Sequence, residues 1–108
     1  MTFDEYQRLA LSTAIYPTES GVVYPVLGLA GEAGEVADKV KKTIRDHGGR
    51  FDAERRRAIA LEAGDVLWYL AALARELGMD LDEIARLNVE KILSRRDRGK
   101  IHGEGDDR

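Results

Sequence analysis

Apolar residues recur at helical spacing along almost the whole chain, and the strict alternation that marks strands is absent. Thr2 followed by Glu5 is a capping-box pattern, which predicts a first helix over residues 3–16. Residues 17–21 read as a connector. A second helix is expected over residues 25–46, because its first residue is a proline and proline suits the first turn of a helix.

Glycines and capping residues divide the rest of the chain. His47-Gly48-Gly49 breaks the second helix, and Asp52 can cap a third one over residues 53–77. After Gly78, a second capping pattern at residues 80–83 opens a fourth helix with a periodic apolar face. The pattern predicts one all-α domain over residues 1–98 and a glycine-rich tail over residues 99–108.

The predicted third helix lacks a polar stripe. Residues 58–74 form a seventeen-residue run in which Glu62 and Asp65 are the only charges. A helix that is apolar all round is expected to be buried on nearly all sides. Because three other helices can barely surround it, we expect a four-helix bundle completed by homo-oligomerisation, as a homodimer or homotetramer.

Composition narrows the class of protein. A chain of 108 residues with 44% apolar and 34% charged residues is of single-domain size and is neither disordered nor membrane-spanning. The absence of cysteine excludes disulfides, a thiolate nucleophile and Cys-ligated zinc. The first six residues lack the basic start and apolar run of a signal peptide, so we expect a cytoplasmic protein without membrane partners.

Basic residues are concentrated in two runs although the formal net charge is −3. Eight lysines and arginines fall within residues 39–57 and five within residues 91–100. This distribution favours a small anionic ligand over a nucleic acid, which the chain shows no motif to bind. On charge alone, solvated helix faces are the favoured explanation of these runs.

A short internal repeat carries the candidate chemistry. Glu32-Ala-Gly-Glu35-Val in the second helix matches Glu62-Ala-Gly-Asp65-Val in the third. Acids three residues apart share a helix face, and two helices joined by a short break run antiparallel. The two pairs are therefore expected to face each other.

Clustered carboxylates need compensation by protons or cations, because like charges in a partly buried site repel. Four oxygen ligands suit Mg²⁺ first and Mn²⁺ second. Buried salt bridges to lysine or arginine are the alternative. A di-iron site is less favoured, because neither histidine follows a glutamate by three residues. The glycines at positions 31, 34 and 64 suggest close backbone approach or room for a ligand.

A magnesium cluster beside basic residues is typical of phosphate chemistry. The chain has no Walker P-loop, and its two histidines offer no Ser-His-Asp arrangement. The pattern Glu-x-x-Glu, 26 intervening residues and Glu-x-x-Asp, followed by Asn88-x-x-Lys91, resembles the MazG-like all-α nucleoside triphosphate pyrophosphohydrolases. The resemblance extends over residues 1–98.

This resemblance implies hydrolysis of the α–β bond of a nucleoside triphosphate, giving a monophosphate and pyrophosphate. It implies four ligands for magnesium: Glu32, Glu35, Glu62 and Asp65. Glu35 would also orient or deprotonate the attacking water. Two other activities stay open, namely the related phosphoribosyl-ATP pyrophosphohydrolase and a non-catalytic helical dimer that binds metal or nucleotide.

Several basic and polar residues are candidates for binding the phosphates. Lys39 lies one turn after Glu35 on the same face, and Asn88 and Lys91 would approach from the fourth helix. The tail resembles the endings of some short MazG-like proteins, and its Lys100 or Arg108 could close over the phosphates.

The base pocket is the least defined part of the sequence-based prediction. Tyr6, Gln7 and Tyr16 are weak candidates for contacting the base. Trp68 and Tyr69 could also stack on a base, but their apolar surroundings favour a place in the core or at an interface.

Overall fold

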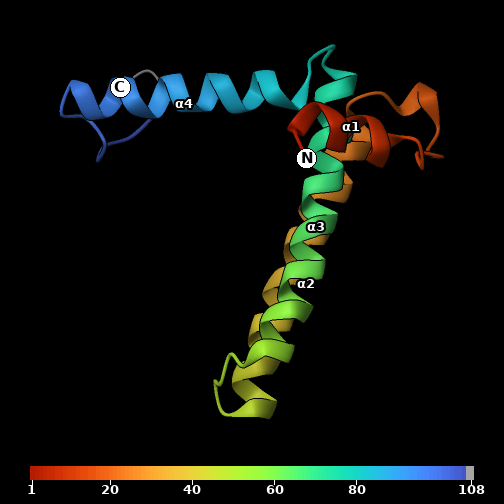
Figure 1. Ribbon diagram of the computed structural model, residues 1–108, viewed down its shortest axis with the longest axis vertical. Helices are drawn as coiled ribbons and strands as arrows, with labels where there is room; N and C mark the ends of the chain where they lie inside the picture. The colour runs from red at the N-terminus through yellow and green to blue at the C-terminus, as the bar shows by residue number, and fades with distance from the viewer. Residues whose placement is uncertain (107–108) are drawn as a thin grey trace.

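The computed structural model describes residues 1–106, which form four α-helices and no strand (Figure 1). The helices are α1 (Phe3–Leu11), α2 (Val23–His47), α3 (Ala53–Glu76) and α4 (Leu81–Asp97), with a short 3₁₀ turn (Thr18–Ser20) between the first two. The all-α prediction is confirmed for this part of the chain. No helix in it is long and apolar enough to cross a membrane.

The α2–α3 hairpin forms a long stem, and its turn is built as the sequence predicts. Gly48 adopts the left-handed conformation with φ of 62° at the end of α2, and its N–H donates to the carbonyl of Thr43. At the start of α3, the Asp52 carboxylate accepts a hydrogen bond of 2.8 Å from the N–H of Arg55. The turn therefore uses local capping chemistry at both helix ends.

Helix α1 is shorter than predicted: it ends at Leu11 and not near Tyr16. The hydroxyls of Ser12 and Thr13 donate to the carbonyls of Leu9 and Ala10 at 2.6 and 2.7 Å. Side-chain bonds of this kind replace the backbone bonds that would continue a helix. The indole N–H of Trp68, far along the chain, also donates to the Ala10 carbonyl at 3.0 Å.

Helix α2 begins two residues earlier than predicted, at Val23, so Pro25 is its third residue. The missing N–H of this proline is tolerated there, because the first turn of a helix has no intrahelical acceptors for its N–H groups. Pro25 is fully buried where the start of α2 enters the core.

The core lies at one end of the stem, where α1 crosses α3 and the start of α4. Gln7 of α1 is buried there, and its amide nitrogen donates to the carbonyls of Ala71 at 3.2 Å and Met79 at 3.4 Å. Its amide oxygen accepts from the N–H of Leu81 at 3.0 Å. One side chain thus joins three helices and the turn between two of them.

Helix α4 points away from the stem instead of lying against it (Figure 1). The radius of gyration is 16.7 Å, whereas a compact chain of about 100 residues has a radius near 13 Å. Within the described residues, few apolar side chains are buried, namely Tyr16, Pro25, Ala71, Ala72, Ala74 and Leu81. One chain by itself therefore does not close into a four-helix bundle.

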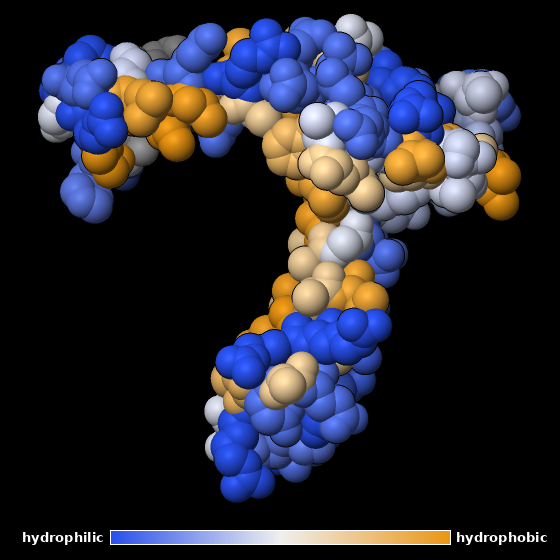
Figure 2. Space-filling model, viewed as in Figure 1, coloured by the Kyte–Doolittle hydropathy of each residue, from blue (hydrophilic) through white to orange (hydrophobic). Residues whose placement is uncertain are grey.

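Within a single chain the third helix is not buried on nearly all sides, so the expected burial would need a second copy of the chain. Only Ala71, Ala72 and Ala74 of α3 are buried, and Leu61 is 62% exposed. The reason is that α4 turns away, so the hairpin-turn half of α3 has only α2 beside it. Figure 2 shows the result as hydrophobic surface on the middle of the stem and on the edge of α4 that faces the stem.

Candidate metal centre

Close packing of α2 against α3 sets the position of the acidic repeats. Gly28 lies against the ring of Tyr69, and a Cβ added at Gly28 would overlap that ring. Glycine therefore lets the two helices approach where an alanine would hold them apart. Glu32 follows Gly28 by one turn, and Asp65 precedes Tyr69 by one turn, so this contact brings the two acids to the same level of the stem.

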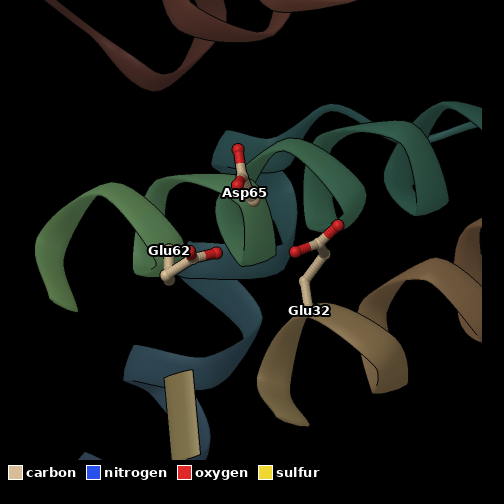
Figure 3. Close-up of side chains that lie close together, drawn as sticks. All are labelled: Glu32, Glu62 and Asp65. Carbon is tan, nitrogen blue, oxygen red and sulfur yellow. The ribbon is translucent and has the colours of Figure 1, made fainter. Parts of the chain in front are cut away.

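Three carboxylates meet one turn away from this contact. Glu32 from α2 and Glu62 and Asp65 from α3 each offer an oxygen, and these oxygens lie within 4.8 Å of one another (Figure 3). Glu32 and Glu62 are half-buried, and Asp65 is exposed. The arrangement offers a divalent cation oxygen ligands from two helices, which is the donor set that Mg²⁺ and Mn²⁺ prefer.

Glu35, the fourth acid of the repeat, lies outside this trio and is exposed. Its negative charge still affects the pKa of a member of the trio. The pKa of Glu32 is raised by partial desolvation first, and then by the negative charges of Asp65, Glu62 and Glu35. Mutual repulsion of this kind is relieved when a cation binds between the carboxylates.

Lys39 supplies the nearest positive charge from the protein itself. Its ammonium nitrogen lies 3.9 Å from a carboxylate oxygen of Glu62, and its side chain is 42% exposed. Within residues 1–106 this is the only ion pair that any member of the trio makes. The salt-bridge alternative to a metal is therefore weakly supported, because one long contact leaves most of the negative charge of the trio uncompensated.

Trp68 and Tyr69 border the carboxylates directly, whereas the sequence-based prediction favoured a place for them in the core or at an interface over a place in the site. Together with Glu32 and Asp65 they line a hollow of about 320 Å³. The two rings meet edge to face, with centroids 5.0 Å apart. The sequence feature that indicates this place is their spacing: they follow Asp65 by three and four residues, which places them on the same helix face as that acid.

The glycines of the repeats leave open space beside the acids. Around Gly31, Gly34 and Gly64, no atom apart from the neighbouring residues and the local backbone of the same helix lies within 4 Å of where a Cβ would be. None of these three therefore serves close packing within one chain, in contrast to Gly28. The backbone of the stem is accessible on both sides of the carboxylates.

The three base-binding candidates lie in different settings. Gln7 holds the core together, as described above. Tyr16 is buried, stacks on Tyr24 with centroids 5.0 Å apart and donates from its hydroxyl to Glu76 at 2.6 Å. Tyr6 is half-buried, and its pKa is raised by burial and by the charge of Asp65. Of the three, Tyr6 is the one whose pKa responds to the charge of a member of the trio.

The phosphate-binding candidates of α4 lie apart from the trio. Asn88 and Lys91 line a separate hollow of about 400 Å³ with Ile84 and Leu87. Figure 1 shows that this part of α4 lies away from the stem that carries the carboxylates. Lys100 lies just beyond α4, and Arg108 falls outside the described residues. A single chain therefore does not bring the carboxylates and the α4 candidates together.

The described residues form an open all-helical chain in which carboxylate oxygens converge from two antiparallel helices. The fold and the site therefore define an α-helical protein that can hold a hard divalent cation. Comparison with known proteins gives the family: the MazG nucleotide pyrophosphohydrolase domain matches residues 25–99, which include all four acids of the repeat. The chain belongs to this family. The resemblance inferred from the sequence motifs is confirmed.

A relative from a bacteriophage matches over the full length of both chains. The Gene 37 protein of Mycobacterium phage L5 is 46% identical over 114 residues and is covered completely, as is this chain. Its name states no activity. No solved structure matches this chain.

Proposed function

We propose that the protein hydrolyses the α–β phosphate bond of nucleoside triphosphates, releasing a monophosphate and pyrophosphate, and so removes non-standard or surplus nucleotides. The observation that supports this most strongly is the carboxylate trio of Glu32, Glu62 and Asp65, whose oxygens lie within 4.8 Å of one another inside the segment that matches the MazG family.

We further propose that magnesium is the cofactor, with manganese as a substitute. Proteins of this family generally depend on a divalent metal. The trio fits such an ion because its donors are all carboxylate oxygens and because partial desolvation, followed by the negative charges of its neighbours, raises the pKa of Glu32. Bound there, the ion would supply an activated water and offset negative charge on the phosphoryl oxygens.

Glu35 and Lys39 complete the α2 side of the proposed site. Glu35 is exposed one turn beyond Glu32 and outside the trio, so its carboxylate can join the metal ligands or accept the proton of the attacking water. Lys39, one turn further, lies at 3.9 Å from Glu62 and can move to a phosphate oxygen when a metal neutralises that glutamate.

The α4 candidates reach the carboxylates in this proposal through a second copy of the chain. Asn88 and Lys91 are separated from the trio within one chain. The stem and α4 both expose apolar side chains, such as Leu61 on the stem and Leu87 on α4. A homodimer or homotetramer that sets α4 of one copy against the stem of another would cover this surface and complete the site.

The test is pyrophosphate release from a panel of standard and damaged nucleoside triphosphates, with magnesium and with EDTA. We expect magnesium-dependent release of equal amounts of pyrophosphate and monophosphate, and loss of activity on EDTA treatment. Phosphoribosyl-ATP belongs in the same panel. Turnover of that compound alone, or nucleotide binding without any turnover, would contradict the proposal.

Variants locate the chemistry at the proposed residues. Glu62→Gln and Asp65→Asn should abolish activity and weaken Mn²⁺ binding, and Glu35→Gln should slow turnover by about a hundredfold or more. Glu54→Gln is the matched control, because Glu54 is an exposed acid on the same helix that pairs with Arg55. Normal turnover by both Glu62→Gln and Asp65→Asn would refute the metal assignment.

A further inference from the structure

The tail as far as Asp106 folds back on α4 and is held there by a buried arginine. Arg95 is 8% exposed, and its Nη2 donates to the carbonyls of Gly105 at 3.2 Å and Asp106 at 3.1 Å. The same nitrogen lies 3.2 Å from Oδ1 of Asp106, and Nζ of Lys91 lies 3.1 Å from that oxygen. One carboxylate oxygen of the tail is therefore shared by two cations of α4.

The arginine is not fully satisfied by this arrangement. Its Nε is buried and has no hydrogen-bond partner among residues 1–106. A guanidinium usually engages a carboxylate or phosphate with two neighbouring nitrogens, which gives two parallel hydrogen bonds. Here three acceptors crowd on Nη2 and none reaches Nε. A group with several oxygens around one centre would satisfy both nitrogens.

The carboxylate in this position is easily exchanged. The side chain of Asp106 is 83% exposed, whereas that of Arg95 is 9% exposed, so the acceptor faces solvent and the donor is fixed. The pKa of Asp106 is held below its usual range by the hydrogen bonds from Lys91 and Arg95. Because the carboxylate of this pair faces solvent, water and salt screen its interaction with Lys91 and Arg95, so a more highly charged anion can compete for the same donors.

Lys91 and Arg95 also continue a polar line along α4. Asn88, Lys91 and Arg95 are spaced at i, i+3 and i+7, which places them on one helix face. The first two line the hollow of about 400 Å³ described above. An anion longer than one carboxylate can therefore extend from Arg95 toward Asn88 along this face.

We propose that Lys91 and Arg95 form a polyphosphate-binding site that Asp106 of the tail occupies in the free chain and leaves when the ligand binds. The identity of the ligand rests on the proposed function, and the occupation by Asp106 rests on the contacts alone. The tail acts as an internal competitor: it keeps Arg95 paired without ligand and weakens the binding of pyrophosphate and triphosphate groups.

The experiment is a titration of the full-length protein with inorganic pyrophosphate at low salt, in EDTA and without nucleotide, followed by NMR. We expect the Nε–H signal of Arg95 and the amide signals of Gly103 and Gly105 to move together as the tail is displaced. The Nε–H of Arg86 is the internal control, since it is already bonded to Asp82 at 3.1 Å. Orthophosphate, which is too short to extend along the face, should bind more weakly.

Two variants define the competition. Asp106→Asn should tighten pyrophosphate binding by about two- to fivefold, the range expected for removing an exposed ion pair. Lys91→Gln should weaken it by about tenfold, because a charge-assisted hydrogen bond is lost. Asp97→Asn, an exposed acid at the end of α4 that pairs with Arg96, is the control for a change of one charge.

Three outcomes would overturn the proposal. They are an unchanged Arg95 Nε–H signal at saturation, unchanged affinity in Asp106→Asn, and weaker binding in that variant, which would make Asp106 a part of the ligand site. Because the titration needs no turnover, tail displacement in a protein that hydrolyses no nucleotide would refute the proposed function and leave this inference standing.

Discussion

Gln7 illustrates how much of this fold depends on single side chains. Its amide makes hydrogen bonds with groups of Ala71, Met79 and Leu81, and these lie at the C-terminal end of α3, in the turn and at the start of α4. Gln7→Leu keeps the size of the side chain but removes all three bonds, which leaves buried backbone groups without partners. We expect the free energy of unfolding to fall by about 2 kcal/mol.

Urea denaturation measures this loss, and Arg8→Leu on the same helix is the control because Arg8 is exposed. Gln7→Leu also distinguishes between two roles of Gln7. If Gln7 only holds the core, KM for the preferred nucleotide should stay unchanged at temperatures where the variant is fully folded. A raised KM with normal stability would make Gln7 a ligand of the base.

At the scale of elements, the stem depends on the contact between α2 and α3 at Gly28. Gly28→Ala places a methyl group inside the ring of Tyr69, so the helices must separate or the ring must move. We expect a loss of about 1–3 kcal/mol in the free energy of unfolding. The carboxylate trio should also loosen, because it lies one turn away, and Mn²⁺ binding should weaken together with stability.

A double-mutant cycle tests the cause. In a Tyr69→Ala background the ring is absent, so Gly28→Ala should lower the free energy of unfolding much less there than in the wild-type chain. An equal cost in both backgrounds would mean that the substitution acts elsewhere. Gly34→Ala, on the same helix with open space around it, should show no loss of this kind in one chain.

Helix limits were predicted best where caps decide them. The turn between α2 and α3 follows from Gly48 and Asp52, which act on backbone within a few residues. The end of α1 was predicted wrongly. Part of the cause is local, since Ser12 and Thr13 bond back to Leu9 and Ala10, but the Trp68 indole that also bonds the Ala10 carbonyl lies 58 residues away in sequence. Local pattern carries no information on such a partner.

The candidate site was predictable to a similar extent. The acids of the repeat share a face by spacing alone, and their antiparallel helices bring Glu32, Glu62 and Asp65 together. The direction of α4 was not predictable, because it depends on how Gln7 and the start of α4 pack at the end of the stem. For the same reason, the contact of Asp106 with Arg95 could not be read from the sequence.

The whole molecule is open as one chain, which makes the source of the α4 residues of the proposed site the decisive question. Its radius of gyration is 16.7 Å, and the stem and α4 both expose large apolar side chains, which supports the proposed assembly with a second copy. If α4 of one copy serves the carboxylates of another, then damage to the carboxylates and damage to α4 affect the same site only when they lie on different chains.

Mixing two inactive variants decides the matter. Asp65→Asn destroys the carboxylate trio, and Lys91→Gln removes the α4 cation. In a dimer with sites shared between copies, a mixed pair has one intact site and one doubly damaged site. Co-expression of the two variants should therefore restore about a quarter of wild-type activity, since half of the pairs are mixed and each has one of two sites. Restored activity that falls on dilution would show that assembly creates the site. Mixed dimers that are detected by native mass spectrometry but stay inactive would place Lys91 in the site of its own chain and refute the shared arrangement.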